Sequence, residues 1–165
     1  LSKYTLRLRK TPTGMIEVYD KLRKKYVAYT PEEDVRQRFI EFLTVDMHFP
    51  GGLICNEIGI VQNGIKRRCD SVILDRNGEP LTIIEYKAPH ISITQRVFDQ
   101  IYRYNTVLKV KYLIVTNGIK TYCCRNDYES NKCLFINGIP SYEEMLKVCI
   151  WKNIYSMLIR NTAML

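Results

Sequence analysis

The spacing of apolar residues along the chain predicts two amphipathic helices before any other property is considered. The first apolar stripe consists of Val35, Phe39, Phe42 and Leu43. These positions follow i, i+4, i+7 and i+8, which is the period of one helix face. The preceding segment 30–33 supplies an N-cap threonine, a proline at the first helical position and the glutamate of a capping box. A second stripe predicts a helix over 94–108; it consists of Val97, Ile101, Tyr104 and Leu108.

Between and around these helices the pattern is that of strands. Alternating residues predict a small antiparallel element within 1–29. Three longer apolar runs follow at 53–62, 65–75 and 80–87. They are separated by Asn63-Gly64 and Asn77-Gly78, and Asn-Gly between such runs is the strongest short-range signal for a two-residue hairpin loop. Loops of that length pair residues whose numbers sum to 127 around the first turn and to 155 around the second.

The remaining segments complete an α/β (α+β) fold. Short strands are expected at 112–115, 122–125 and 133–136, followed by a helix from Ser141 to about Leu158. The order is αβββαβ with β and α additions, which predicts a central mixed sheet flanked by helices. We expect one domain over 1–165: its parts are a β extension (1–29), a core (30–125) and a C-terminal strand and helix (126–165).

Composition narrows the classes of function. A hydrophobic content of 46% and a charged content of 25% are typical of a soluble globular domain, and no apolar run approaches the roughly 20 residues of a membrane helix. The formal net charge of +8 favours a polyanionic partner, although a solvated basic surface explains it equally well. The six cysteines form no CxxC and no Cys/His cluster. This indicates free buried thiols, a cytoplasmic location and no structural zinc.

The acidic residues carry the main chemical hypothesis. If both Asn-Gly pairs form two-residue loops, Glu57 faces Asp70 and Asp70 faces Glu85, with Lys87 farther along the same face. Like charges that oppose one another destabilise a sheet, and hard cations prefer carboxylate ligands. We therefore expect Asp70 and Glu85 to bind Mg²⁺, with Mn²⁺ as an alternative. The Tyr86 carbonyl and Glu57 are the further candidate ligands. Lys87 is expected near the attacked phosphate.

This arrangement resembles a known family of nucleases. Asp70 followed by Glu85-Tyr86-Lys87 is similar to the D…ExK core of the PD-(D/E)xK nuclease superfamily, whose common core is αβββαβ. The run from 30 to about 125 looks like the N-terminal domain of type I restriction enzyme R proteins. The resemblance implies a restriction-endonuclease-like fold and a metal-dependent DNA endonuclease, with Asp70, Glu85 and Lys87 as catalytic residues.

A second motif strengthens the resemblance. Gln100 and Tyr104 match the QxxxY motif of RecB-type nucleases and share one face of the predicted helix, so the resemblance implies that they assist catalysis. It also implies DNA as a partner, together with helicase-motor, methyltransferase or specificity subunits, and it leaves a homodimer open. Two departures stand out: Cys69 replaces the proline before the aspartate, and the chain has no GxxxxGK[ST] loop for a helicase motor.

Several alternatives stay open. Arg68 and Lys87 flank the acids, so the row also fits a cross-strand ladder of salt bridges. The same fold fits a non-catalytic DNA-docking or subunit-assembly module, and RNA or branched DNA would suit the same chemistry. Tyr104 fits the core as well as the site, and Glu33 is expected to serve the helix cap. The candidate nucleic-acid-binding residues are Lys66, Arg67, Arg68, Arg36, Arg96 and Arg103.

Overall fold

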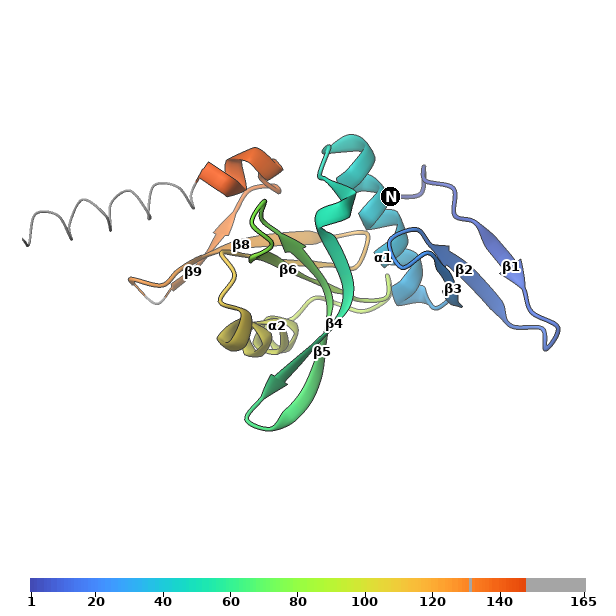
Figure 1. Cartoon of the computed structure of the whole chain (residues 1–165), viewed down its shortest axis with the longest axis horizontal. Coiled ribbons are helices and arrows are strands. Elements are labelled where there is room, and N and C mark those ends of the chain that lie inside the picture. The colour runs from blue at the N-terminus through green and yellow to red at the C-terminus, as the bar shows by residue number, and fades with distance from the viewer. Residues whose placement is uncertain (131, 148–165) are drawn as a thin grey trace, which may run out of the picture.

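The computed structural model describes residues 1–130 and 132–147, which form a small N-terminal sheet, two long helices and a large mixed sheet (Figure 1). The N-terminal strands are β1 (Leu8–Lys10), β2 (Ile16–Asp20) and β3 (Lys25–Ala28). The helices are α1 (Pro31–Glu41), which continues as a π-helical turn over Phe42–Asp46, and α2 (Gln95–Leu108), and a 3-10 turn covers Gly51–Leu53. The strands of the large sheet are β4 (Ile54–Gln62), β5 (Ile65–Leu74), β6 (Pro80–Tyr86), β7 (Tyr112–Thr116), β8 (Thr121–Asp127) and β9 (Lys132–Ile136).

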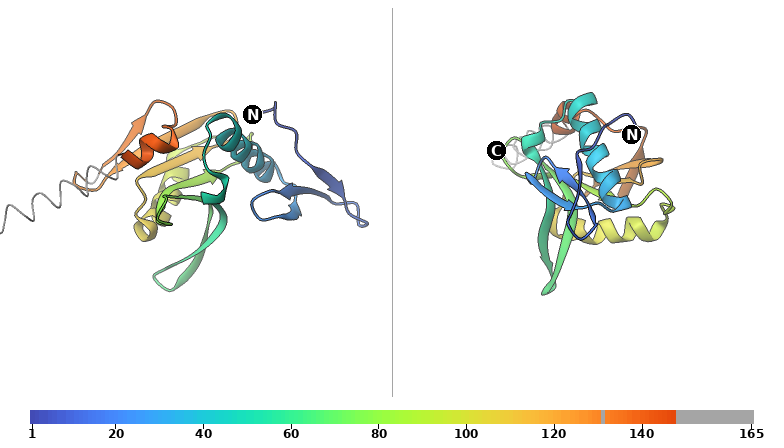
Figure 2. Two further views of the ribbon diagram at one scale, coloured as in Figure 1. Left: turned by 45° about the horizontal axis from the view of Figure 1, so that its top comes forward. Right: turned by 90° about the vertical axis from the view of Figure 1, so that its right-hand side faces the viewer.

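The large sheet has the strand order β4-β5-β6-β7-β8-β9. β6 and β7 pair in parallel, with α2 in the connection between them, and the other neighbouring strands pair antiparallel. The two helices cover opposite faces of the sheet, and the N-terminal strands lie beside α1 (Figure 2). The predicted α+β fold, with a mixed sheet flanked by helices and a small N-terminal β element, is confirmed.

Each face of the sheet has its own apolar core. On one face, Phe39 of α1 packs with Ile84 and Tyr86 of β6. On the other, Ile101 of α2 packs with Ile83 of β6. All five side chains are no more than 1% exposed. Because β6 is buried on both faces, the polar residues at its end stand on a strand that packing holds firmly in place.

The first predicted turn forms as expected. Asn63 and Gly64 both have positive φ, 50° and 76°, and Gln62 pairs with Ile65 across them. Positive φ at both central residues is the requirement of a type I′ hairpin loop. The pairs of β4 and β5 accordingly sum to 127, as predicted from the sequence.

The second turn is longer than predicted. At Asn77-Gly78 the glycine alone has positive φ, 84°, and the Asp75 amide donates to the Glu79 carbonyl at 2.8 Å. A two-residue loop is therefore wrong for this hairpin. A β-bulge at the end of β5 then shifts the register by one residue, so Ser71 still pairs with Ile84 as predicted. The longer loop and the bulge offset one another.

The C-terminal helix agrees with its prediction as far as the structure describes it. Residues 142–147 are helical, and the Glu144 amide donates to the Ser141 hydroxyl at 3.3 Å. The part of the predicted helix that reaches Leu158 lies outside the described residues. The five cysteines within the described part are free thiols. None of the helices described there is long and apolar enough to cross a membrane.

Candidate active site

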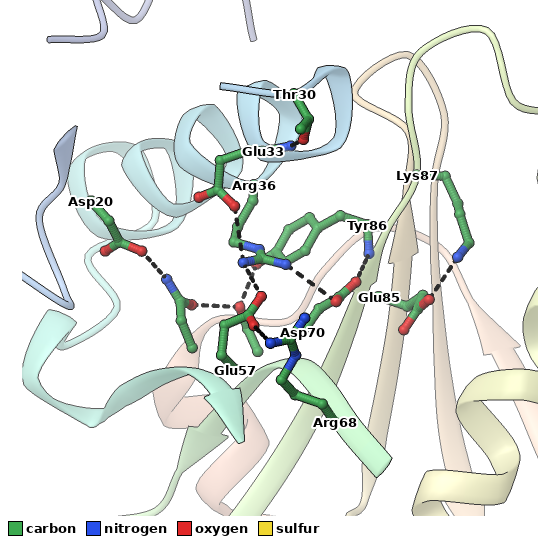
Figure 3. A network of polar contacts seen from close by, with 12 residues as sticks. Asp20, Thr30, Glu33, Arg36, Glu57, Arg68, Asp70, Glu85, Tyr86 and Lys87 are labelled. Atoms are coloured by element: carbon green, nitrogen blue, oxygen red, sulfur yellow. Dashed lines mark hydrogen bonds and ion pairs between the residues drawn. The ribbon is translucent and has the colours of Figure 1, made fainter. Parts of the chain in front are cut away.

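The acidic and basic residues of the D…ExK pattern meet where β5 and β6 separate (Figure 3). Glu85 lies near the end of β6 and Lys87 directly after it, while Asp70 comes from the adjoining β5. An Asp70 carboxylate oxygen, Oδ2, accepts a hydrogen bond from the Tyr86 amide at 3.0 Å. This bond fixes the Asp70 carboxylate beside the backbone of the residue that follows Glu85.

Glu85 is the most enclosed of these acids, with 2% of the residue exposed. Its Oε1 accepts hydrogen bonds from Lys87 Nζ and from Gln100 Nε2, each at 2.7 Å. Gln100 Nε2 also lies 3.2 Å from the Tyr104 hydroxyl. The structure therefore brings both members of the QxxxY motif to the ExK strand. Tyr104 is also part of the α2 core. It therefore belongs both to the core and to the candidate site, the two alternatives that the sequence left open.

The surroundings of Glu85 disfavour its negative charge. Burial, followed by the charge of Asp70, raises the pKa of Glu85 to about 7, although the bond from Lys87 acts in the opposite direction. Burial is the largest single influence on the pKa of Lys87 and lowers it, but the bond to Glu85 and the negative charges of Glu85, Glu32 and Asp70 together leave that pKa above its ordinary value. A divalent cation bound between the two neighbouring carboxylates would reduce the repulsion that helps to raise the pKa of Glu85.

The ladder between β4 and β5 is irregular at the acids. Glu57 has a φ of 61° and forms no ladder pair with Asp70, although the pairs on either side keep the predicted register. Cys69 lies in the α2 core, whereas the Ser71 hydroxyl accepts from the Tyr86 hydroxyl on the α1 face. Since side chains two residues apart normally share a face, the strand changes face at Asp70. Asp70 also forms no ladder pair with Glu85, because the pairing of β5 with β6 ends at Ser71 and Ile84. The predicted straight row of three carboxylates is therefore wrong.

Arg36 of α1 forms ion pairs with Glu57 and Asp70, two acids of the predicted row, and with Glu33. Its guanidinium lies 2.7 Å from Glu57 Oε1, 3.0 Å from Glu33 Oε2 and 3.2 Å from Asp70 Oδ1, and it also lies over the Tyr86 ring. With 6% of the residue exposed, Arg36 contacts these acids instead of facing solvent, where the sequence had suggested a DNA-backbone contact. The Glu33 amide donates a hydrogen bond to the hydroxyl of the N-cap residue Thr30, as expected. The Glu33 carboxylate, in contrast, turns to Arg36.

A chain of polar contacts that the sequence did not reveal supports the site from the N-terminal sheet. Asp20 accepts from Asn56 Nδ2 at 3.0 Å, and Asn56 Oδ1 accepts from the Ser71 hydroxyl at 2.6 Å. The chain ends at the Tyr86 hydroxyl, 3.1 Å from Ser71. Arg23 joins it through an ion pair with Asp20. No local pattern marks residues that meet only after folding, so sequence spacing had no signal for them.

The candidate DNA-contacting cations are dispersed over the molecule. Lys66 and Arg68 are exposed on β5, where Arg68 pairs with Glu57 Oε2 at 2.6 Å, and Arg67 is partly buried. Arg96 and Arg103 are exposed on α2. The exposed members of this set can reach a phosphate without any change in the fold. The structure leaves their proposed role a prediction.

The site offers only a small number of carboxylate ligands for a hard divalent cation. Within residues 1–130 and 132–147, no group of three or more His, Cys, Asp and Glu side chains is close enough to hold a metal. Mg²⁺ is usually bound by one or two carboxylates together with water and substrate phosphates. Asp70 and Glu85 meet that requirement. Glu57 is paired with Arg36 and Arg68, which leaves its predicted metal role without geometric support.

Comparisons with known proteins agree with this architecture. Residues 31–140 match the family model described as "Type I restriction enzyme R protein N terminus". The fold resembles a fragment structure described as an HsdR subunit of a type I restriction enzyme from Vibrio vulnificus, with a TM-score of 0.54 and 18% identity. The match covers 70% of this chain and 24% of that one, so the chain spans about a quarter of its length. No curated protein matches significantly. The chain belongs to the family of type I restriction enzyme R protein N-terminal domains.

Proposed function

We propose that this domain hydrolyses phosphodiester bonds in DNA with the aid of Mg²⁺. The observation that carries the proposal is the convergence of Asp70, Glu85 and Lys87 where the end of β6 separates from β5, with Gln100 bound to Glu85 at 2.7 Å. Family membership favours DNA as the polyanion and a restriction–modification assembly as its setting. The net charge of +8 is consistent with such a partner.

The carboxylates of Asp70 and Glu85 would hold the metal, with the Tyr86 carbonyl as a further ligand. A divalent cation bound there would lower the pKa of a coordinated water and would neutralise charge on the scissile phosphate. Lys87 Nζ, held by Glu85, supplies a fixed positive charge beside the same phosphate. No covalent intermediate is expected, since Asp70 and Glu85 are proposed as metal ligands and the hydrogen bonds described around them include no histidine bonded to a serine or cysteine.

Gln100 has a positioning role in this proposal. Its amide donates to the same Glu85 oxygen as Lys87 does, and Tyr104 contacts the amide in turn. These bonds restrict the rotation of the Glu85 carboxylate at the end of a rigid strand. A metal ligand whose orientation is fixed in advance binds with less loss of conformational freedom.

One observation favours a second candidate, a non-catalytic docking module. Arg36 and Lys87 already pair with Asp70 and Glu85, so the acids are partly neutralised without a metal. A closed cluster of this kind would stabilise a binding domain that never cleaves DNA. The two candidates differ in whether the site takes up a divalent cation and whether Lys87 matters for a reaction.

Substitution of Lys87 by alanine separates them. We expect Lys87→Ala to keep the fold and the affinity for DNA but to abolish Mg²⁺-dependent nicking of plasmid DNA. Lys10→Ala, which removes the same charge from the exposed strand β1, is the control and should nick DNA at the wild-type rate. Cleavage that survives in highly purified Lys87→Ala protein would exclude the proposed mechanism. Absence of nicking in every variant, wild type included, would favour the docking module.

A further inference from the structure

An aromatic hollow lies on the α2 side of the large sheet. It has a volume of about 480 Å³, within the range of small-ligand sites. It is lined by the buried residues Leu113 and Cys124 and by the rings of Phe98, Tyr102 and Phe135. Polar groups are present at the same hollow: Gln95 and Asp99 of α2 also line it.

The aromatic rings form a connected cluster that remains open to solvent. The Phe98 centroid lies 5.2 Å from that of Phe135 and 6.0 Å from that of Tyr122, and each pair is close to perpendicular. Phe135 is 63% exposed, Tyr102 41% and Tyr122 36%. Aromatic side chains normally gain most of their stabilisation by burial. Several exposed rings around one hollow therefore indicate a surface suited to a flat, aromatic ligand.

The sheet register places this cluster next to Glu85. Glu85 pairs with Val115 of β7, and Val115 pairs with Tyr122 of β8. Paired residues point to the same face, so Glu85 and Tyr122 share one face two strands apart, a separation of about 10 Å between their backbones. Phe98 and Gln100 stand on different sides of α2, because residues two apart on a helix do not share a face, and Gln100 binds Glu85. The hollow and the candidate active site thus lie on the same face of the sheet.

We propose that the hollow binds an unpaired nucleobase of the DNA strand whose phosphodiester lies at Glu85. The inference rests on the proposed function and names its substrate class, single-stranded or locally unpaired DNA. Bases in a duplex are stacked on one another, whereas an unpaired base can stack on protein rings, and every base has a face suited to this. The strand continuing from the hollow would bring its phosphates to Lys87.

The polar residues of the hollow favour a base over an apolar segment of a partner protein. Gln95 Nε2 donates to Asp99 Oδ1 at 3.0 Å, so an amide and a carboxylate stand together in the hollow. Both groups can form hydrogen bonds to the edge of a base, as they do in nucleic-acid readout. An apolar protein segment would offer these two groups no partner beyond one another. The basic charge of the chain also complements a nucleic-acid strand.

The test is binding of a short single-stranded DNA that carries one 2-aminopurine, measured in chelator so that no cleavage occurs. Stacking quenches the fluorescence of this base. Wild-type protein should quench it and should bind the single strand more tightly than a duplex of the same sequence. Phe135→Leu keeps an apolar side chain but loses the ring, so the affinity for the single strand should fall about 5- to 100-fold and quenching should be lost.

Two variants complete the test. Phe135→Tyr keeps a ring and should retain quenching and affinity. Leu134→Ala changes the neighbouring residue of β9, which is 41% exposed and points to the opposite face, and should behave as wild type. Wild-type quenching and affinity in Phe135→Leu would overturn the inference and leave the hollow as a protein-docking surface. A wild-type protein that binds the single strand without quenching would overturn it as well.

Failure of this inference is distinguishable from failure of the proposed function. Mg²⁺-dependent nicking without any quenching by wild-type protein would refute the base-binding hollow alone. Quenching that depends on Phe135, in a protein that never cleaves DNA, would refute the nuclease function alone.

Discussion

The charge of Glu85 should weaken the metal-free fold, and replacement of Glu85 by glutamine should remove that effect. The pKa of this carboxyl rises from 4.5 to about 7 in the folded protein, through burial first and the charge of Asp70 second. A raised pKa means that the folded state binds the proton more tightly than the unfolded state. The resulting stabilisation is complete below about pH 4.5 and is lost as the pH rises through about 7.

The size of the effect follows from that difference of about 2.5 pH units. At about 1.36 kcal/mol for each unit, ionisation of Glu85 costs up to about 3 kcal/mol of unfolding free energy. Glu85→Gln keeps the shape of the protonated side chain and an oxygen for the bonds from Lys87 and Gln100, and it cannot ionise. At about pH 8 in the absence of metal, we therefore expect Glu85→Gln to be more stable than the wild type.

Urea unfolding in chelator, followed by circular dichroism, measures this difference. Between about pH 5 and about pH 8 the wild-type free energy of unfolding should fall by about 2 to 3 kcal/mol relative to that of Glu85→Gln. Glu79→Gln, which changes an exposed carboxylate on the neighbouring turn, is the matched control and should alter stability by less than about 0.5 kcal/mol. Parallel pH profiles for the wild type and Glu85→Gln would refute the reasoning.

Three further changes test other parts of the structure. Arg36→Ala removes the guanidinium that the partly buried Glu57 and Asp70 share, so urea unfolding should show a loss of about 3 kcal/mol; a loss below about 1 kcal/mol would contradict the role of Arg36. Gly118→Ala should lower the melting temperature more than Gly64→Ala in calorimetry. Both glycines have positive φ, but a Cβ at Gly118 would lie 3.3 Å from Val35 Cγ2, whereas Gly64 is open; an equal decrease would argue against this contact. Mn²⁺ affinity measured by titration calorimetry should fall about tenfold for each pH unit below about 7, because protons compete for Glu85, and should level off above it; an affinity independent of pH would exclude Glu85 as a ligand.

Local signals predicted the elements that carry the site. The threonine and proline before α1, the Asn63-Gly64 turn and the apolar stripe of α2 each depend on residues close in sequence, and each forms as expected. The pairing of Ser71 with Ile84 was also predicted, although through a turn that is longer than expected. The β-bulge in the pairing of β5 with β6 restores the register that the longer loop would otherwise shift, and an Asn-Gly pair carries no signal for such a bulge.

The arrangement around Arg36 was beyond the reach of sequence spacing. Strand register specifies which residues face one another within a sheet, but Arg36 arrives from a helix packed over the sheet. Its attraction for Glu57 and Asp70 accompanies a left-handed backbone at Glu57, a conformation that glutamate rarely adopts. The change of face at Asp70 is therefore a tertiary effect. Pairing arithmetic alone treats every strand as regular and cannot include it.

The central claim is that Asp70 and Glu85 together bind a divalent metal. The most direct measurement is a crystal structure of the protein soaked in Mn²⁺, with anomalous diffraction recorded to locate the ion. We expect one manganese peak between the two carboxylates, within coordinating distance of both and beside the Tyr86 carbonyl. A saturating soak that leaves no peak there, with Asp70 still paired to Arg36 and Glu85 still bound to Lys87, would contradict it.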